Sequence, residues 1–163
     1  MAKSSQLTAD DILAAIRRAN PKYPLLTELV LTDVDRDRGN GDLRKRRIDG
    51  LLIGPRGQRT AIEVKVSRQD FLRETEAKRR PWIRCSHRFV YAAPKGLLRA
   101  NEIPKGIGLW EVSLTAKAKT GFVSIYELTV AKRCIINKNP DPVPDQLFAA
   151  LAYRLDNPRR RRR

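Results

Sequence analysis

The chain has 163 residues, of which 41% are hydrophobic, so it is long and apolar enough for one domain with a real core. Its 34 Lys and Arg outnumber its 18 Asp and Glu, and the net charge of +16 predicts a polyanionic partner, usually nucleic acid. A basic protein whose charge only confers solubility is the alternative. No apolar run approaches the roughly 18 residues of a membrane span and no secretory signal is visible, so we expect a cytoplasmic protein without membrane contact.

Cysteine and histidine are scarce, which limits the metal and redox chemistry. Cys85 and Cys134 form no CxxC pair and His87 is the single histidine, so a zinc site of the Cys/His type is not expected. Two reduced thiols are favoured over a disulfide. A structural His87 is favoured over a catalytic base, because no partner in the sequence positions it.

The first 46 residues predict a helix, a strand and a loop. Thr8 caps a helix over 8–19, and two aspartates follow in its first turn, where the helix dipole favours carboxylates. The apolar, β-branched segment 25–34 predicts a strand. Residues 35–46 are expected to form a charged loop that contains glycine.

The remainder predicts a hairpin followed by alternating helices and strands. Strands are expected over 47–53 and 59–66, joined by turn formers at 54–58. A helix over 68–84 follows, in which Pro81 kinks or restarts the chain. After it we expect, in order, a strand over 87–93, a short helix over 95–101, strands over 107–113 and 121–130, a proline-rich linker over 137–144, a helix over 146–155 and a terminal run of arginines.

This order, α-β-β-β-α-β with more strands after it, predicts an α/β domain with a central mixed sheet flanked by helices. We expect one domain over 1–136, a linker and C-terminal helix packed on the same domain over 137–158, and a basic tail over 159–163. The tail is expected to add sequence-independent affinity for nucleic acid.

The predicted hairpin brings three charged side chains together. If its loop is centred on Arg56, paired residue numbers sum to 112, and Asp49 lies opposite Glu63 on one face of the strand pair. Lys65 is two residues beyond Glu63 and shares that face. The residues expected on the other face, in the core, are Ile48, Ile62, Val64 and Val66.

Two facing carboxylates repel each other unless a cation neutralises them. Mg²⁺ prefers oxygen ligands, and Mn²⁺ is an alternative, so Asp49 and Glu63 are candidate metal ligands together with the backbone carbonyl of Val64. A metal held there activates a water and stabilises charge on a scissile phosphate. Lys65 is expected to orient that water or to contact the phosphate.

The pattern Ile48-Asp49, a turn, then Glu63-Val64-Lys65 resembles the D…(D/E)-x-K motif of the PD-(D/E)XK nucleases. A longer string is similar to the MmcB-like branch of that superfamily, which is associated with DNA repair. The string consists of residues 46–49, 62–67, 70–71, 78, 88–94, 103–104 and 106–109, within about residues 25–127. The chain departs from that branch in its basic insert at 35–46, in its polyarginine tail, and in Ser86-His87, where an acidic residue is expected.

The resemblance implies a restriction-endonuclease-like core, a divalent metal and hydrolysis of DNA phosphodiester bonds in repair, recombination or replication, with an endonuclease favoured over an exonuclease. In many members an acidic residue near the first helix or strand completes the metal site. Glu28 is the candidate here, with an ordinary surface glutamate as the alternative. Lys78 lies on the helix where many members place a residue that faces the active site, which makes it a further catalytic candidate.

Basic side chains near this site are candidates for DNA contacts, with a solvated charged face as the alternative. They are Arg47, Arg79, Arg80 and Arg84. Trp82 is a candidate for stacking on an unpaired base, whereas core packing is favoured for Trp110. Helix capping is at least as good an interpretation of Asp70 as a role in the site.

The rival interpretation is a nucleic-acid-binding protein that keeps a nuclease-like fold without activity. The complete set of Asp49, Glu63 and Lys65 argues against it, since a decayed site is expected to have lost at least one member. A basic RNA-binding structural protein would leave the facing carboxylates unexplained. The DNA structure that is cut and the oligomeric state stay open at this stage.

Overall fold

A computed structural model describes residues 7–34, 43–117 and 124–156 of the chain. In these residues the protein is an α/β domain built on a six-stranded mixed sheet flanked by helices, which confirms the fold class expected from the sequence. The elements are α1 (Ala9–Ala19), β1 (Leu25–Val34), β2 (Leu43–Ile53), the 3-10 turn η2 (Pro55–Gly57), β3 (Arg59–Val64), α2 (Arg68–Leu72), α3 (Glu76–Arg84), β4 (Arg88–Pro94), β5 (Gly108–Lys117), β6 (Ser124–Lys132) and α4 (Asp145–Asp156).

The strands lie side by side in sequence order, β1 to β6. The first three are antiparallel, β3, β4 and β5 run parallel, and β6 returns antiparallel to β5. A parallel neighbour requires a crossover connection, and between β3 and β4 this connection contains α2 and α3. The crossover packs α3 against β2 and β4.

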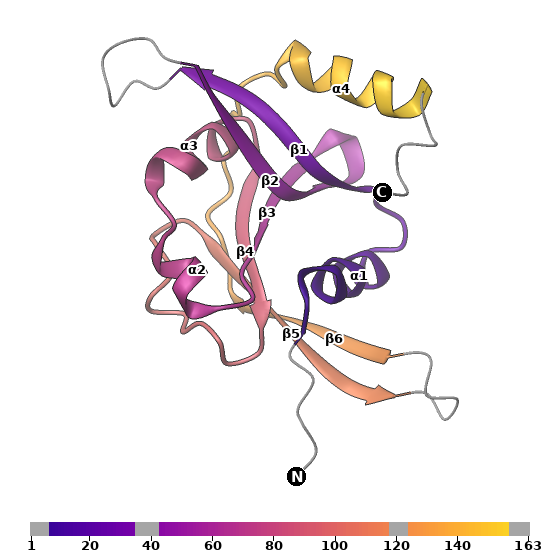
Figure 1. Cartoon of the computed structure of the whole chain (residues 1–163), viewed down its shortest axis with the longest axis vertical. Coiled ribbons are helices and arrows are strands. Elements are labelled where there is room, and N and C mark those ends of the chain that lie inside the picture. Colours follow the sequence, from indigo (N-terminus) through magenta and orange to yellow (C-terminus); the bar gives the residue numbers. More distant parts are fainter. Residues whose placement is uncertain (1–6, 35–42, 118–123, 157–163) are drawn as a thin grey trace.

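Helices cover both faces of the sheet, with α2 and α3 on one side and α1 on the other (Figure 1). The α3-side core contains Trp82, Phe89 and Tyr91, together with Leu147 of α4, which packs against β1. The α1-side core contains Ile12 and Ile16 of α1 together with buried side chains of β3, β4 and β5. No helix in the described part of the chain is long and apolar enough to cross a membrane.

The capping pattern read from the sequence forms at the start of α1. The Thr8 side chain accepts a hydrogen bond from the Asp11 amide at 3.2 Å, and the Asp11 carboxylate accepts one from the Thr8 amide at 2.9 Å. This reciprocal capping box satisfies two amide donors that a helix N-terminus would otherwise leave without partners. The predicted start of this helix is confirmed.

Three predicted boundaries are wrong. β2 begins at Leu43, so part of the expected charged loop is strand, while residues 35–42 and 118–123 and the arginine tail lie outside the described residues. Residues 95–101 form turns rather than a helix. The expected helix over 68–84 is two helices, and it breaks at residues 73–75 rather than at Pro81. Thr75 is extended and begins α3, whereas Pro81 costs α3 a single backbone hydrogen bond and is tolerated.

β1 and β2 change the core to which they contribute. Leu25 packs in the α1-side core, whereas Leu29 packs in the α3-side core, although alternation places both on one face. Between them Glu28 has a φ of 52°, in the left-handed region, which turns the strand. Ile48, which pairs with Leu29, also lies in the α3-side core, so its predicted place beside Ile62 is wrong.

Gly108 is the tightest glycine of the sheet. A Cβ there would lie 2.9 Å from a Val90 methyl and 3.1 Å from the Lys132 carbonyl oxygen, and the backbone atom cannot move aside easily. We expect Gly108→Ala to lower the free energy of unfolding by about 1–3 kcal/mol through overpacking. Chemical denaturation measures the change. Gly54→Ala is the matched control, because its Cβ would meet no atom closer than 3.6 Å, and equal stability losses would contradict the packing described here.

Candidate active site

The site begins where β2 and β3 separate. Gly50 pairs with Ile62 and Leu51 with Ala61, which is the register predicted from the loop at 54–58. The paired ladder ends there, and the Val64 amide donates a hydrogen bond of 2.8 Å to the Asp49 carboxylate instead of to a strand carbonyl. Asp49 thus lies at the opening between the strands, with one carboxylate oxygen engaged by the backbone.

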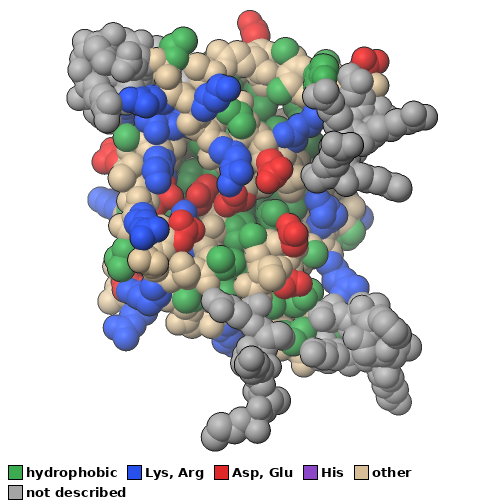
Figure 2. Space-filling view, viewed as in Figure 1, with side chains coloured by type: hydrophobic (Ala, Val, Ile, Leu, Met, Phe, Trp, Pro, Cys, Tyr) green, Lys and Arg blue, Asp and Glu red, His purple; other side chains and the backbone are tan. Residues whose placement is uncertain are grey.

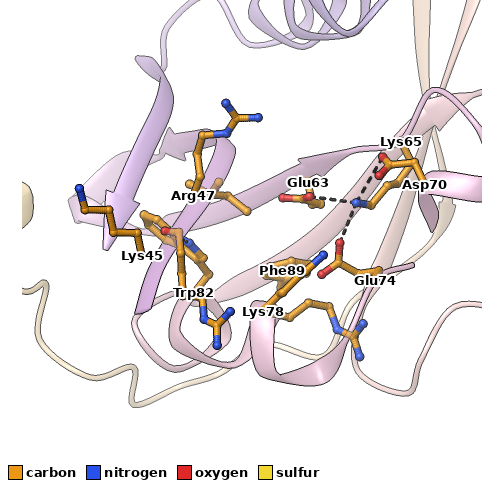
Figure 3. A pocket seen from close by; sticks show the side chains of 12 residues that line it. Lys45, Arg47, Glu63, Lys65, Asp70, Glu74, Lys78, Trp82 and Phe89 are labelled. Carbon is orange, nitrogen blue, oxygen red and sulfur yellow. Dashed lines mark hydrogen bonds and ion pairs between the residues drawn. The ribbon is translucent and has the colours of Figure 1, made fainter. Parts of the chain in front are cut away.

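A buried ion cluster surrounds the Lys65 ammonium group, as Figure 3 shows. Its nitrogen lies 2.9 Å from a Glu63 oxygen, 2.7 Å from a Glu74 oxygen and 3.5 Å from an Asp70 oxygen. The Lys65 side chain is 3% exposed and the Glu74 side chain 6% exposed, so this pair is almost completely removed from water. Ion pairs of this kind depend on all partners being present, because an unpaired buried charge is costly.

The electrostatics of the site raise the pKa of Glu63 and of Asp49. Burial, together with repulsion from Asp49, raises the pKa of Glu63 from 4.5 to about 7, although Lys65 opposes the change. Burial also raises the pKa of Asp49, against its hydrogen bond to the Val64 amide. Burial lowers the pKa of Lys65, but its hydrogen bonds to Glu74 and Glu63 outweigh this and raise it overall. Lys65 is therefore charged at neutral pH.

The cluster around Lys65 holds more acidic than basic groups. Four carboxyl groups interact with Lys65, those of Asp49, Glu63, Asp70 and Glu74, and Arg47 is a second cation that acts on Asp49. A cation beside Asp49 and Glu63 would relieve the repulsion that raises the pKa of Glu63, so these two residues fit a divalent metal. Within the described residues, no three Asp, Glu, His or Cys side chains are arranged to hold a metal ion, so such a metal would depend on these two and on main-chain oxygen.

A cavity of about 250 Å³ opens above this cluster, between β2 and the α2–α3 segment. Glu63, Lys65, Asp70 and Glu74 line its acidic end, and Ile48, Trp82 and Phe89 form its apolar wall. Its basic wall consists of Lys45, Arg46, Arg47, Lys78 and Arg79. In Figure 2, acidic side chains gather near the middle of this face with Lys and Arg side chains around them. The cavity therefore offers a polyanion basic contacts beside buried carboxylates.

Several predicted site residues lie at this cavity. Glu63, Lys65 and Lys78 line it, and Arg47 and Arg79 belong to its basic wall. Asp49 lies beside it, close enough to raise the pKa of Glu63. The Val64 side chain is buried in the α1-side core. Its main-chain amide, between Glu63 and Lys65, donates a hydrogen bond to the Asp49 carboxylate.

Other predicted site residues lie elsewhere. Glu28 is 73% exposed, its carboxylate faces Arg47 at 4.0 Å, and it does not line the cavity. Arg84 is paired with Asp141 at 2.7 Å, and neither Arg80 nor Arg84 lines the cavity. Glu28 misses the cluster because the left-handed backbone at this residue directs its carboxylate toward solvent and Arg47.

The tryptophans Trp82 and Trp110 and the single histidine, His87, have structural contacts. Trp82 is 1% exposed, and its indole N–H donates to the Arg46 carbonyl at 3.1 Å, so it joins α3 to β2 and is not free to stack on a base. His87 accepts a hydrogen bond from the Arg59 amide at 3.1 Å, consistent with its expected structural role. Trp110 is partly buried against the α1-side core.

Glu74 is the site residue that the sequence did not suggest. It lies in the break between α2 and α3, outside both helices, where no periodic pattern marks its direction. A helix continuing over 68–84 would have placed it four residues from Asp70 and from Lys78, on the face expected to point at the site, and this spacing is the signal that could have found it. Ser67 rather than Asp70 caps α2: the Ser67 hydroxyl accepts a hydrogen bond from the Asp70 amide at 3.1 Å, and the Asp70 carboxylate approaches Lys65 at 3.5 Å.

No family model matches the chain, and no curated protein matches it either. Among solved structures, the fold is similar to SPO1766, a protein of unknown function from Silicibacter pomeroyi, at 21% sequence identity and a TM-score of 0.58. The similarity covers 94% of this chain and 92% of that protein. At this identity it establishes a shared fold alone.

The raised pKa of Glu63 predicts a pH-dependent stability. The folded state keeps a proton that the unfolded state releases between about pH 4.5 and pH 7, so stability falls as pH rises through this window. The shift corresponds to roughly 3 kcal/mol or slightly more at about 1.36 kcal/mol per pKa unit. Denaturant titrations at several pH values measure it. In Glu63→Gln this part of the pH dependence should disappear, and a Glu63→Gln profile parallel to that of the wild type would contradict the assignment.

Proposed function

We propose that the protein is a metal-dependent deoxyribonuclease of the PD-(D/E)XK type, acting in DNA repair, recombination or replication. The observation that carries this proposal is the convergence of Asp49, Glu63 and Lys65 at the opening between β2 and β3, with a raised pKa at Glu63. Structural ion pairs usually balance their charges, whereas this cluster has excess carboxylate next to a basic cavity. A restriction-endonuclease-like core is part of the proposal.

The residues divide into three roles. Asp49 and Glu63 would hold Mg²⁺ or Mn²⁺, with the Val64 carbonyl as a further oxygen ligand. When bound, the metal would supply a Lewis acid that activates water and offsets charge on a phosphodiester. Lys65 is held charged and in place by Glu74, so it presents a fixed cation next to the reacting groups.

The basic wall supports DNA as the substrate. Arg47, Lys78 and Arg79 lie beside the carboxylates, and the whole chain carries a net charge of +16. Basic contacts with phosphates release condensed counterions, so affinity should fall steeply with salt concentration. These side chains would hold a strand against the cavity while the carboxylate end performs the chemistry.

A nucleic-acid-binding protein without activity is the second candidate, and the enclosure of Lys65 favours it. The ammonium group is 3% exposed and engaged by Glu63 and Glu74, so it does not reach a substrate in this arrangement. On this reading the cluster is a structural ion network, and the basic cavity binds nucleic acid without cutting it.

A cleavage assay separates the two candidates. Labelled single-stranded, duplex, flapped and branched DNA would be incubated with the wild-type protein in Mg²⁺, Mn²⁺ or EDTA. The nuclease proposal expects cleavage of at least one substrate with metal and none with EDTA. Salt-dependent binding without cleavage under every metal condition would support the inactive binder.

A further inference from the structure

Two arginines of the cavity wall carry buried donors without partners. Within the described residues, buried side-chain nitrogen or oxygen atoms that lack a hydrogen-bond partner occur at Arg46 Nε, Arg79 Nε and Ser86 Oγ. Arg46 and Arg79 line the cavity above the carboxylates, whereas Ser86 does not. Buried polar atoms in native proteins are nearly always paired, and an unpaired donor on a charged group is especially costly. The Nε donor of each of these two guanidinium groups therefore has no acceptor within the described residues.

The protein holds these two side chains from opposite sides of the cavity. Arg46 belongs to β2 and Arg79 to α3, and the Trp82 indole of α3 donates to the Arg46 carbonyl at 3.1 Å, which fixes the two elements relative to each other. The Arg79 guanidinium also donates to the Tyr91 hydroxyl at 3.1 Å. Tyr91 is itself held by edge-to-face contacts with Phe71 and Phe89. These contacts hold the two sides of the cavity in place before a ligand binds.

An anion with several oxygens would supply the missing acceptors. Guanidinium groups present planar, forked donors that match phosphate, and both arginines lie in the same cavity. Glu63 and Glu74 at the other end would repel an anion, so a phosphate is expected at the Arg46–Arg79 wall rather than on Lys65.

The shape of the cavity limits the substrate. Its volume of about 250 Å³ is below the roughly 300–1,000 Å³ of pockets that enclose drug-sized ligands, so it admits about one nucleotide. The Glu63 side chain is 20% exposed and the Glu74 side chain 6% exposed, which places the acidic end below the surface. A volume of this size does not hold a base pair, whereas it can hold one nucleotide of a single strand.

We propose that Arg46 and Arg79 form a phosphate-binding subsite that takes a backbone phosphate of a single DNA strand. The inference rests on the proposed function for the identity of the strand, but the subsite is a binding feature and does not require cleavage. It assigns a role to Arg46, which the sequence did not suggest, and it separates Arg79 from Arg80 and Arg84, which lie outside the cavity.

The test is DNA binding in EDTA, which excludes metal-dependent cleavage. Fluorescence anisotropy would compare a labelled single-stranded oligonucleotide with the same sequence as duplex, for the wild type, Arg46→Gln, Arg79→Gln and the control Arg84→Gln. We expect Arg46→Gln and Arg79→Gln each to weaken single-strand binding about tenfold or more, and Arg84→Gln to weaken it much less. The loss of binding affinity in the double variant should be smaller than the product of the two single losses, because both side chains contact one phosphate.

Charge-preserving variants distinguish the subsite from general charge. Arg46→Lys and Arg79→Lys keep the charge but lose the forked donors, so the subsite predicts weakened binding for them too. If an Arg variant fails to fold, the wild-type protein still tests the subsite. Its melting temperature should be higher in inorganic phosphate than in chloride of equal ionic strength. Binding by the Gln variants equal to that of Arg84→Gln, or no preference for single strands, would overturn the inference.

The binding and cleavage results can fail independently. A wild type that binds through Arg46 and Arg79 but never cuts DNA with Mg²⁺ or Mn²⁺ keeps the subsite and refutes the nuclease. A wild type that cuts DNA while both Gln variants bind like the control refutes the subsite and keeps the nuclease.

Discussion

Replacing Lys65 by methionine is expected to destabilise the fold by about 3–5 kcal/mol near neutral pH. The ammonium group is 3% exposed and contacts Glu63 and Glu74 at 2.9 and 2.7 Å. Methionine fills a similar volume but leaves these carboxylates buried without a cation. Urea denaturation of the wild type and the variant measures the difference, with Lys78→Met as the control, because Lys78 is an exposed lysine of the same cavity.

The pH profile of the Lys65→Met variant separates lost charge from lost packing. Without Lys65 the folded-state pKa of Glu63 should rise further above its unfolded value, because Lys65 lowers it in the wild type. A carboxyl with a raised folded pKa destabilises the fold above that pKa and does so less as pH falls. The variant should therefore recover much of its stability between neutral pH and about pH 5. A loss below about 1 kcal/mol, or one that does not depend on pH, would mean that the ion cluster does not form.

Replacing Glu63 by glutamine, or Asp49 by asparagine, is expected to reduce metal-dependent DNA cleavage by at least about 10²-fold. Each change keeps the size of the side chain and removes one of the two charges that would hold the metal. DNA binding in EDTA should be unchanged or tighter, because a negative charge is removed beside the basic wall. Single-turnover cleavage rates with Mg²⁺ or Mn²⁺ measure the effect.

Asp141→Asn is the matched control for these variants. Asp141 is a half-exposed carboxylate paired with Arg84, and it does not line the cavity. The Asp141→Asn variant should cut DNA at the wild-type rate. Cleavage by Glu63→Gln at the rate of Asp141→Asn would assign any nuclease activity to another site or to a contaminant.

Local rules predicted the elements and the core of the site. The turn formers at 54–58 fix the hairpin register, and this local register alone puts Asp49, Glu63 and Lys65 near one another. The cap at Thr8 likewise depends on residues within one helical turn. Such features are read from neighbours in the sequence, and they were predicted correctly.

Features that depend on distant contacts were not predicted. Glu74 lies in the break between α2 and α3, and its ion pair with Lys65, nine residues earlier, joins that break to the segment after β3. Glu28 was expected at the site but turns away through a positive φ. Ile48 changes cores for the same reason, since strand alternation fails where β1 and β2 twist. The unpaired Nε of Arg46 is likewise visible only once β2 and α3 are brought together.

The central claim is that Asp49 and Glu63 form a site for a divalent cation, and metal binding tests it most directly. Isothermal titration of Mn²⁺ into the wild type, Glu63→Gln, Asp49→Asn and the control Asp141→Asn requires neither DNA nor catalysis. We expect the wild type and Asp141→Asn to bind one Mn²⁺ per chain, with protons released as Glu63 loses its proton, because its pKa is about 7. Glu63→Gln and Asp49→Asn should bind at least about tenfold more weakly. Equal Mn²⁺ binding by all four proteins, or no binding by the wild type, would contradict the account.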